Sequence, residues 1–124
     1  MIYLDTHIVV WLYQKDENRF STRGREIINE NDLLISPMVE LELEYLFEIE
    51  RLNVRSDEIL SYLENRIGIK KCTIPFSDVI WEAKKYTWTQ DPFDRIITAQ
   101  AGIHNSPLLT KDKTILRNYS KAIW

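Results

Sequence analysis

Short apolar runs that end at a polar residue alternate along the chain with longer segments of helical period. This alternation is typical of repeated βα units, in which helices connect the strands of a parallel sheet. We therefore expect the α/β class. The predicted strands are Ile2–Leu4, Leu33–Ile35, Lys71–Ile74, Leu108–Leu109 and Ala122–Trp124.

Residues that commonly begin or end helices lie between these strands. Thr6 precedes the apolar segment 8–13, and Ser36-Pro37 combines a capping hydroxyl with a proline at the first helical position. A glycine often ends a helix, because it adopts the left-handed backbone conformation without strain. The remaining predicted helix starts are Ser56, Ser77 and Asp91-Pro92, and the predicted ends are Gly68 and Gly102.

Length and composition narrow the class of protein. The chain has 124 residues, 44% of them hydrophobic, which suits one domain over residues 1–124 with a real core and excludes intrinsic disorder. The single Cys72 has no partner for an internal disulfide, consistent with a reducing compartment. The N-terminus lacks the pattern of a signal peptide, and no apolar run approaches the about 20 residues that cross a bilayer. We expect a cytoplasmic protein without a membrane partner.

The charge balance argues against nucleic-acid binding by bulk positive charge. The chain has 16 Lys and Arg against 19 Asp and Glu, a formal net charge of −3. A stretch near the C-terminus reverses this sign, because four cations there accompany one acid. These cations either guide RNA or form an ordinary solvated face. They are Lys111, Lys113, Arg117 and Lys121.

Four acids follow predicted strands or lie near the start of predicted helices. Asp5 comes directly after the first strand, and Asp112 lies just beyond Leu108–Leu109. Glu42 lies in the helix after the second strand, and Asp94 opens a later helix. Ligands of an open parallel sheet bind outside the carboxyl ends of its strands, so we expect these acids to gather at that edge.

The helical angle distinguishes Glu42 from the acids around it. At about 100° per residue, an apolar face forms from Met38, Leu41, Tyr45, Ile49 and Leu52. Glu42 points between the directions of Ile49 and Leu46, whereas Glu40, Glu44 and Glu48 point to the other side. Burying an unpaired carboxylate is costly, so Glu42 requires a cationic partner, a proton or a metal ion.

Each acid also has an ordinary structural interpretation. Asp5 alone is explained as support for a helix N-terminus, and Glu42 as half of an ion pair with an arginine. Asp91 and Asp94 fit helix caps, and Asp112 fits a turn. Their convergence favours a shared role, because independent caps and turns have no reason to gather at one edge of a sheet. Together they indicate a metal site made of oxygen ligands.

The chemistry that fits such a site is metal-assisted hydrolysis. Mg²⁺ and Mn²⁺ prefer carboxylate and water oxygens, and two such ions about 4 Å apart can flank a displacement at phosphorus. His7 and His104 do not form a convincing rival scheme. The chain also has no zinc-binding Cys/His spacing, glycine-rich phosphate loop or nucleophile-elbow serine.

Four blocks of sequence carry a family resemblance, and they span almost the whole chain. They are Leu4–Leu12, with Asp5-Thr6 near its start, Ile35–Leu43, Asp91–Ala101 and Pro107–Asp112. In this order, and in a chain of this size, they resemble PIN-domain proteins of the VapC toxin type. The resemblance implies a three-layer α/β/α sandwich around a short, mostly parallel sheet.

The resemblance also implies site residues. It assigns the metal-binding and catalytic acids as Asp5, Glu42, Asp94 and Asp112. Thr6 and Thr110 would support them, while Asp91 either reaches the site or caps its helix. Arg95 either places a backbone phosphate or pairs with a nearby acid. The chain departs from the family at Val39, where a hydroxyl residue is common, and at Leu41, where an aromatic is common; neither change removes an acid.

The implied function is an RNA-cleaving toxin of a toxin–antitoxin pair. It would be an Mg²⁺- or Mn²⁺-dependent endoribonuclease using metal-activated water, forming homodimers inhibited by a small cognate antitoxin. Trp11 and Tyr13 either line an antitoxin groove or belong to the core. Two alternatives are a non-catalytic PIN-like module that binds antitoxin or RNA, and a phosphatase with Asp5 as nucleophile. The phosphatase is disfavoured because His7 stands where it would need an acid.

Overall fold

A five-stranded sheet, parallel throughout, forms the centre of the computed structural model, which describes residues 1–124. The strand order is β3-β2-β1-β4-β5, so the chain builds outward from β1 on one side and then on the other. The position where the order reverses is the usual ligand-binding position of an open α/β sheet. The strands are β1 (Ile2–Leu4), β2 (Leu33–Ile35), β3 (Lys70–Lys71), β4 (Leu108–Leu109) and β5 (Ala122–Ile123).

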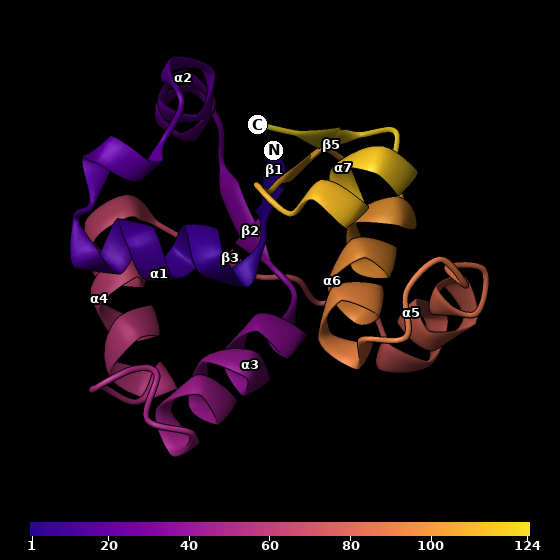
Figure 1. Ribbon diagram of the computed structural model, residues 1–124, viewed down its shortest axis with the longest axis horizontal. Coiled ribbons are helices and arrows are strands. Elements are labelled where there is room, and N and C mark those ends of the chain that lie inside the picture. The colour runs from indigo at the N-terminus through magenta and orange to yellow at the C-terminus, as the bar shows by residue number, and fades with distance from the viewer.

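Seven α-helices cover the two faces of this sheet and confirm the three-layer α/β/α fold. They are α1 (Thr6–Gln14), α2 (Thr22–Glu30), α3 (Pro37–Glu48), α4 (Ser56–Ile67), α5 (Phe76–Ala83), α6 (Pro92–Gly102) and α7 (Lys113–Asn118), with a short 3₁₀ turn at Glu17–Arg19. Figure 1 shows α1, α2 and α4 on one side of the sheet and α5, α6 and α7 on the other. Helix α3 contacts α1, α4 and α6 and so bridges the two layers. None of the helices combines the length and apolar character needed to span a membrane.

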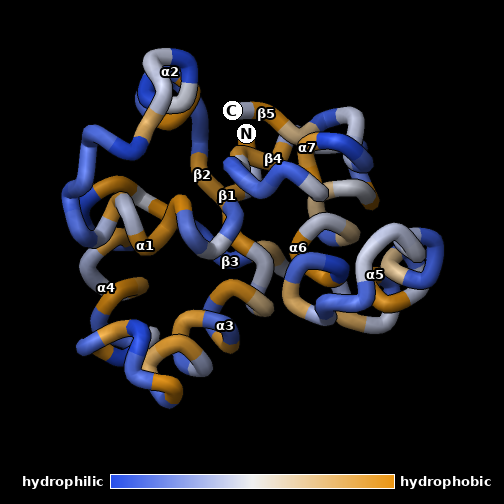
Figure 2. Tube along the Cα trace, in the orientation of Figure 1, coloured by the Kyte–Doolittle hydropathy of each residue, from blue (hydrophilic) through white to orange (hydrophobic).

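The core is built around β1, whose three residues are all buried. Strands covered on both faces read as continuous apolar runs, and Figure 2 shows β2, β4 and β5 in the colour of hydrophobic residues. A cluster of 21 buried hydrophobic residues joins these strands to the inner faces of the helices. The buried central strand therefore fixes the position of the residues that follow it directly, beginning with Asp5.

The pairing of β1 with β4 positions the first candidate site residues. Leu4 lies opposite Leu109 in the parallel register, and the backbone N–H of Asp5 donates to the carbonyl of Leu109 over 3.1 Å. Asp5 and Thr110, the next residue of each strand, therefore leave the sheet side by side. The prediction that polar residues at strand ends converge is confirmed for this pair.

Some predicted boundaries were wrong. The third strand is Lys70–Lys71 instead of Lys71–Ile74: the chain enters the sheet two residues after Gly68 ends α4, and it leaves the sheet before Pro75. Ser77 does not start a helix: α5 begins at Phe76, with Pro75 in the capping position. The sequence analysis missed α2, which Ser21 caps by accepting the N–H of Gly24.

Two other helix starts differ by one residue. Thr6 is the first residue of α1, and the capping residue is Asp5. Ser56 is likewise the first residue of α4, and a carboxylate oxygen of Glu44 accepts from its N–H over 3.2 Å. By contrast, Ser36 and Asp91 cap α3 and α6 as predicted, each followed by proline.

The left-handed backbone conformation of Gly68 at the end of α4 can be tested by substitution. It ends α4 with φ of +70°, and a Cβ added there would meet nothing within 4 Å, so only backbone strain opposes a side chain. We expect Gly68→Ala to lower the free energy of unfolding by about 1–2 kcal/mol, measured by urea denaturation. Gly68→Asn should lose less, since asparagine tolerates this conformation. Equal stability of the alanine variant and the wild type would contradict this interpretation.

Candidate active site

Asp5 is fixed through both of its carboxylate oxygens. Oδ1 accepts from the backbone N–H of Thr6 over 2.8 Å, which caps α1, and Oδ2 accepts from Thr110 Oγ1 over 2.7 Å. The residue is only 2% exposed. The carboxylate is therefore held in one orientation at the carboxyl end of the sheet, and the Thr110 hydroxyl is one of the two groups that hold it.

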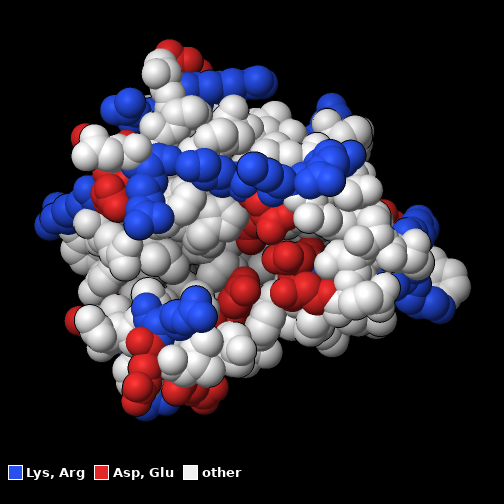
Figure 3. Space-filling model, viewed as in Figure 1, with Lys and Arg blue, Asp and Glu red and all other residues white.

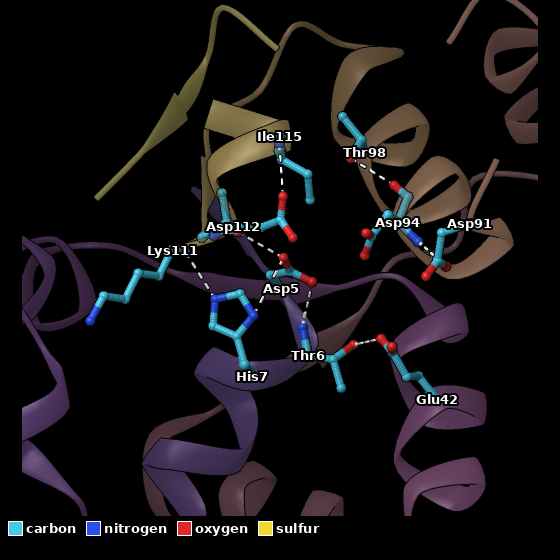
Figure 4. A network of polar contacts seen from close by, with 11 residues as sticks. Asp5, Thr6, His7, Glu42, Asp91, Asp94, Thr98, Lys111, Asp112 and Ile115 are labelled. Carbon is cyan, nitrogen blue, oxygen red and sulfur yellow. Dashed lines mark hydrogen bonds and ion pairs between the residues drawn. The ribbon is translucent and has the colours of Figure 1, made fainter. Parts of the chain in front are cut away.

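Asp112 lies on the same edge and is oriented by the same threonine. Its backbone N–H donates to Thr110 Oγ1 over 3.0 Å, and its Oδ1 accepts from the N–H of Ile115 over 2.9 Å, which caps α7. Thr110 thus contacts Asp5 through its hydroxyl proton and Asp112 through its oxygen. Figure 4 shows the Asp112 carboxylate above that of Asp5.

Glu42 enters the site from α3 and is bound by α1. Thr6 Oγ1 donates a hydrogen bond to Glu42 Oε1, which holds this carboxylate beside the start of α1. Asp5 caps the helix that Thr6 begins, and the hydrogen bond from Thr6 therefore links Glu42 indirectly to Asp5. The angular prediction that Glu42 faces a special environment agrees with this geometry.

The apolar face used for that prediction was placed wrongly. Leu41, Tyr45 and Ile49 are 56%, 43% and 43% exposed, whereas Val39 and Leu43 are fully buried. Helix α3 is apolar around most of its circumference, and only the stripe facing the sheet joins the core. Glu42 lies at the border between the buried and exposed stripes, which is why it faces the site.

Asp94 and Asp91 lie at the start of α6. Asp91 Oδ1 accepts the N–H groups of Phe93 and Asp94 over 2.8 and 3.2 Å, which makes it the cap. The Asp94 carboxylate has no hydrogen bond or ion pair within the protein, and its backbone carbonyl accepts from Thr98 Oγ1 over 2.7 Å. In Figure 4 the Asp94 carboxylate projects toward Asp5 and Asp112, while Asp91 lies farther from them.

A cleft of about 630 Å³ brings these acids together. Its lining includes all four predicted ligands and Asp91, together with Trp11, Arg19 and Arg51. Figure 3 shows the acids gathered in a hollow, with Lys and Arg side chains forming an arc along one border. The prediction that the acids converge at one edge of the sheet is confirmed.

The negative charge in this cleft is not neutralised by the protein. None of the five acids forms an ion pair with a lysine or arginine. Burial, reinforced by Asp5 and Asp91, raises the pKa of Glu42 to about 7 even though the hydrogen bond from Thr6 opposes this shift. Burial also raises the pKa of Asp94 to about 7, and its acidic neighbours contribute in the same direction. The site therefore favours any cation that enters it.

Comparison with known protein families identifies the fold. The family model of the PIN domain matches residues 2–121. This chain belongs to the PIN-domain family. No individual curated protein sequence matches it.

Solved structures show the same fold at low sequence identity. A chain of VapBC2 from Rickettsia felis, bound to a DNA fragment from their promoter, is 22% identical with a TM-score of 0.63, over 99% of this chain and 96% of that one. VapBC-1 from nontypeable Haemophilus influenzae matches at 18% identity and a TM-score of 0.65, covering 100% and 96%. A toxin–antitoxin complex from Klebsiella pneumoniae matches at 14% identity and a TM-score of 0.65, over 100% of this chain and 97% of that one.

His7 lines the acidic cleft although it was not predicted as a site residue. Its Nε2 accepts from the backbone N–H of Lys111 over 2.9 Å, and its Nδ1 lies 3.6 Å from Asp5 Oδ2. Burial lowers the pKa of His7, and an accepting Nε2 requires a neutral ring whose proton is on Nδ1, toward Asp5. Its position in the first turn of α1, two residues after Asp5, is the signal that could have found it.

The side chains of the acidic cleft fit a divalent cation that prefers oxygen ligands, such as Mg²⁺ or Mn²⁺. The donors are all oxygens, and two of the carboxylates ionise reluctantly without a cation. No three Asp, Glu, His or Cys side chains are arranged to enclose a single ion. Magnesium keeps several waters and is usually bound through one or two carboxylates, so such an enclosure is not required.

Arg95 forms no ion pair with a nearby acid. Its Nε donates to the carbonyl of Ala83 over 2.8 Å, at the end of α5, so the guanidinium joins α6 to α5 instead of facing the acids. Glu40 pairs with Lys71 over 2.9 Å on the surface. Glu40, which was not predicted as a site residue, lies outside the cleft. Arg19 and Arg51 line the cleft and were not predicted, because neither belongs to a recognisable motif.

The raised pKa values predict how stability depends on pH without metal. Folded Glu42 and Asp94 keep their protons to about pH 7, whereas unfolded carboxyls lose them near about pH 4. Between these values the folded state binds more protons, so these groups lower stability as the pH rises. In EDTA, Glu42→Gln and Asp94→Asn should gain stability over the wild type from pH 5 to pH 8 in urea denaturation.

The control is Glu26→Gln, at an exposed position of α2. Its stability difference from the wild type should stay constant over the same pH range. A constant difference for Glu42→Gln and Asp94→Asn as well would show that their carboxyls are not strained by burial and mutual repulsion.

Proposed function

We propose that this PIN domain is a metal-dependent endoribonuclease. The observation that carries the proposal is the cleft of un-neutralised acids at the carboxyl edge of the sheet. A protein that only binds RNA has no use for such a cluster, because phosphates are repelled by it. The same cluster becomes useful when a divalent cation offsets its charge.

Asp5, Glu42, Asp94 and Asp112 would hold Mg²⁺ or Mn²⁺. The bound ion would supply a water nucleophile at neutral pH and stabilise the leaving oxygen of the phosphodiester. Thr110 fixes the orientation of Asp5, and Thr6 fixes that of Glu42. Asp91 acts as the cap of α6, which orients Asp94 from one turn below.

The biological role we propose is that of a toxin in a cytoplasmic toxin–antitoxin pair. The solved structures with this fold include complexes described as VapBC or toxin–antitoxin. A small cognate antitoxin and a second copy of the chain are the partners we expect. Exposed apolar side chains in two regions support protein partners. They are Leu41 and Tyr45 on α3 with Ile49 just after it, and Phe76 and Trp81 on α5.

The catalytic proposal is tested by removing single carboxylates. Asp5→Asn and Asp94→Asn should each reduce Mg²⁺-dependent cleavage of single-stranded RNA by at least about 100-fold, because each removes a charged ligand while keeping its shape. Cleavage by the purified chain without antitoxin is followed by gel, with EDTA as the metal-free control. Thermal unfolding checks that the variants fold. Full activity of either folded variant, or of the wild type in EDTA, would refute the mechanism.

Substitutions at Asp91 distinguish a role as helix cap from a role as metal ligand. Asparagine caps helices as well as aspartate does, so Asp91→Asn should keep its stability and most of its cleavage activity. Asp91→Ala should lose about 1 kcal/mol of stability through the lost cap. Both variants are compared in urea denaturation and in the cleavage assay. Loss of cleavage by a stable Asp91→Asn, to the level of Asp94→Asn, would show that Asp91 is a ligand.

A further inference from the structure

An aromatic ring in the lining of the cleft, that of Trp11, carries two cations. The Arg19 guanidinium lies 5.4 Å from the centroid of the Trp11 indole, and Lys111 Nζ lies 6.0 Å from it. Lys111 Nζ is also 5.7 Å from the ring of Trp124. Trp11 and Arg19 line the same cleft as the acids. We call Trp11, Arg19 and Lys111 the cationic wall.

Packing fixes the ring on which this wall is built. The centroid of the Trp11 ring lies 5.9 Å from that of Phe20, which it meets edge-on. The corresponding distances to the rings of Trp124 and His7 are 5.9 Å and 4.9 Å. Its indole therefore has little freedom to reorient. Both cations have donor groups available for a ligand. Lys111 forms no ion pair, and Arg19 pairs with Asp16 only through its Nε, over 2.8 Å, which leaves its terminal nitrogens available. The Arg19 side chain is 56% exposed.

The cations on the Trp11 ring do not pair with the acids of the cleft. Neither Arg19 nor Lys111 forms an ion pair with a site acid, and Figure 4 shows the Lys111 side chain extending away from Asp112. Ion pairing across the cleft would neutralise both sets. Their separation suits a ligand with several negative charges, one reaching the acids with their metal and others reaching the cations.

We propose that the cationic wall binds single-stranded RNA beside the phosphate that is cut, an inference that rests on the proposed function. Arg19 and Lys111 bind neighbouring backbone phosphates, and Trp11 positions the two cations. Basic side chains interleaved with aromatic rings are typical of single-strand sites, whereas the bases of a duplex are stacked within it. A local wall of this kind also explains how a chain with a net charge of −3 holds RNA.

Binding is measured separately from cleavage. A fluorescent single-stranded RNA is titrated with the protein in EDTA, and anisotropy is followed at several salt concentrations. We expect Arg19→Ala and Lys111→Ala each to weaken binding by about 3- to 10-fold, and each to reduce the slope of log affinity against log salt by about 0.7. Trp11→Leu should weaken binding similarly by releasing both cations, whereas Trp11→Phe should retain most of it.

The matched control is Lys84→Ala. Lys84 also lies over a tryptophan, with Nζ 4.3 Å from the ring of Trp81, but it belongs to the α5 end of the molecule and lies outside the cleft. This variant should keep the affinity and the salt slope of the wild type. Thermal unfolding of every variant separates lost binding from lost folding.

The outcomes distinguish this inference from the proposed function. RNA binding that depends on Arg19 and Lys111, without any metal-dependent cleavage, would support the wall and refute the nuclease. Cleavage by the wild type, with binding by Arg19→Ala and Lys111→Ala equal to that of Lys84→Ala, would overturn the wall alone. Equal affinity for duplex RNA and single-stranded RNA would also overturn the inference. Polyglutamate, titrated in the same way, serves as an acidic polypeptide probe. If Arg19→Ala and Lys111→Ala weakened binding to polyglutamate but not to RNA, the cationic wall would fit an acidic protein partner and the inference would be wrong.

Discussion

The pairing of β1 with β4 is the constraint on which the site depends. It places Asp5 next to Thr110, and the two oxygens of Asp5 then reach the first turn of α1 and the Thr110 hydroxyl. From this point two chains of contacts extend, one through Thr110 to Asp112 and one through Thr6 to Glu42. Only Asp94 is positioned independently, by the cap of α6. A shift of one residue in the β1–β4 register would therefore separate Asp5 from Thr110 and from Asp112.

Holding these acids together without cationic partners costs stability. The folded chain raises the pKa of Glu42 and Asp94 to about 7, which means that it resists their ionisation. Cations are available nearby, but Arg19 and Lys111 lie on the Trp11 ring and pair with none of the acids. An ion pair would relieve the repulsion and would also occupy the carboxylate oxygens that a divalent ion needs. The strain is thus a direct consequence of keeping the cleft available to a ligand.

The sequence was most informative where function and local structure use the same residue. Asp5, Asp91 and Asp112 each cap a helix, so strand ends and capping signals located them without any knowledge of tertiary contacts. Glu42 was found by its helical angle even though the apolar face beside it proved to be exposed, because the acid lies at the border of both stripes. Arg19 and Arg51 could not be found in this way. Their place in the cleft depends on how the segments after α1 and α3 return to it, which no local pattern encodes.

The net charge of −3 acquires a different meaning once the charges are placed in space. The four proposed ligands outnumber the excess of acids, so the surface outside the cleft is not anionic on balance. Arg19 lines the cleft together with the acids, and Lys111 lies over the same Trp11 ring as Arg19. A phosphate at the acids is repelled until a divalent ion offsets them, whereas a phosphate at Arg19 or Lys111 is attracted with or without metal. On the proposed function, the cationic wall therefore binds the RNA strand and the acids take part in cutting it. Only the cutting step depends on the metal ion.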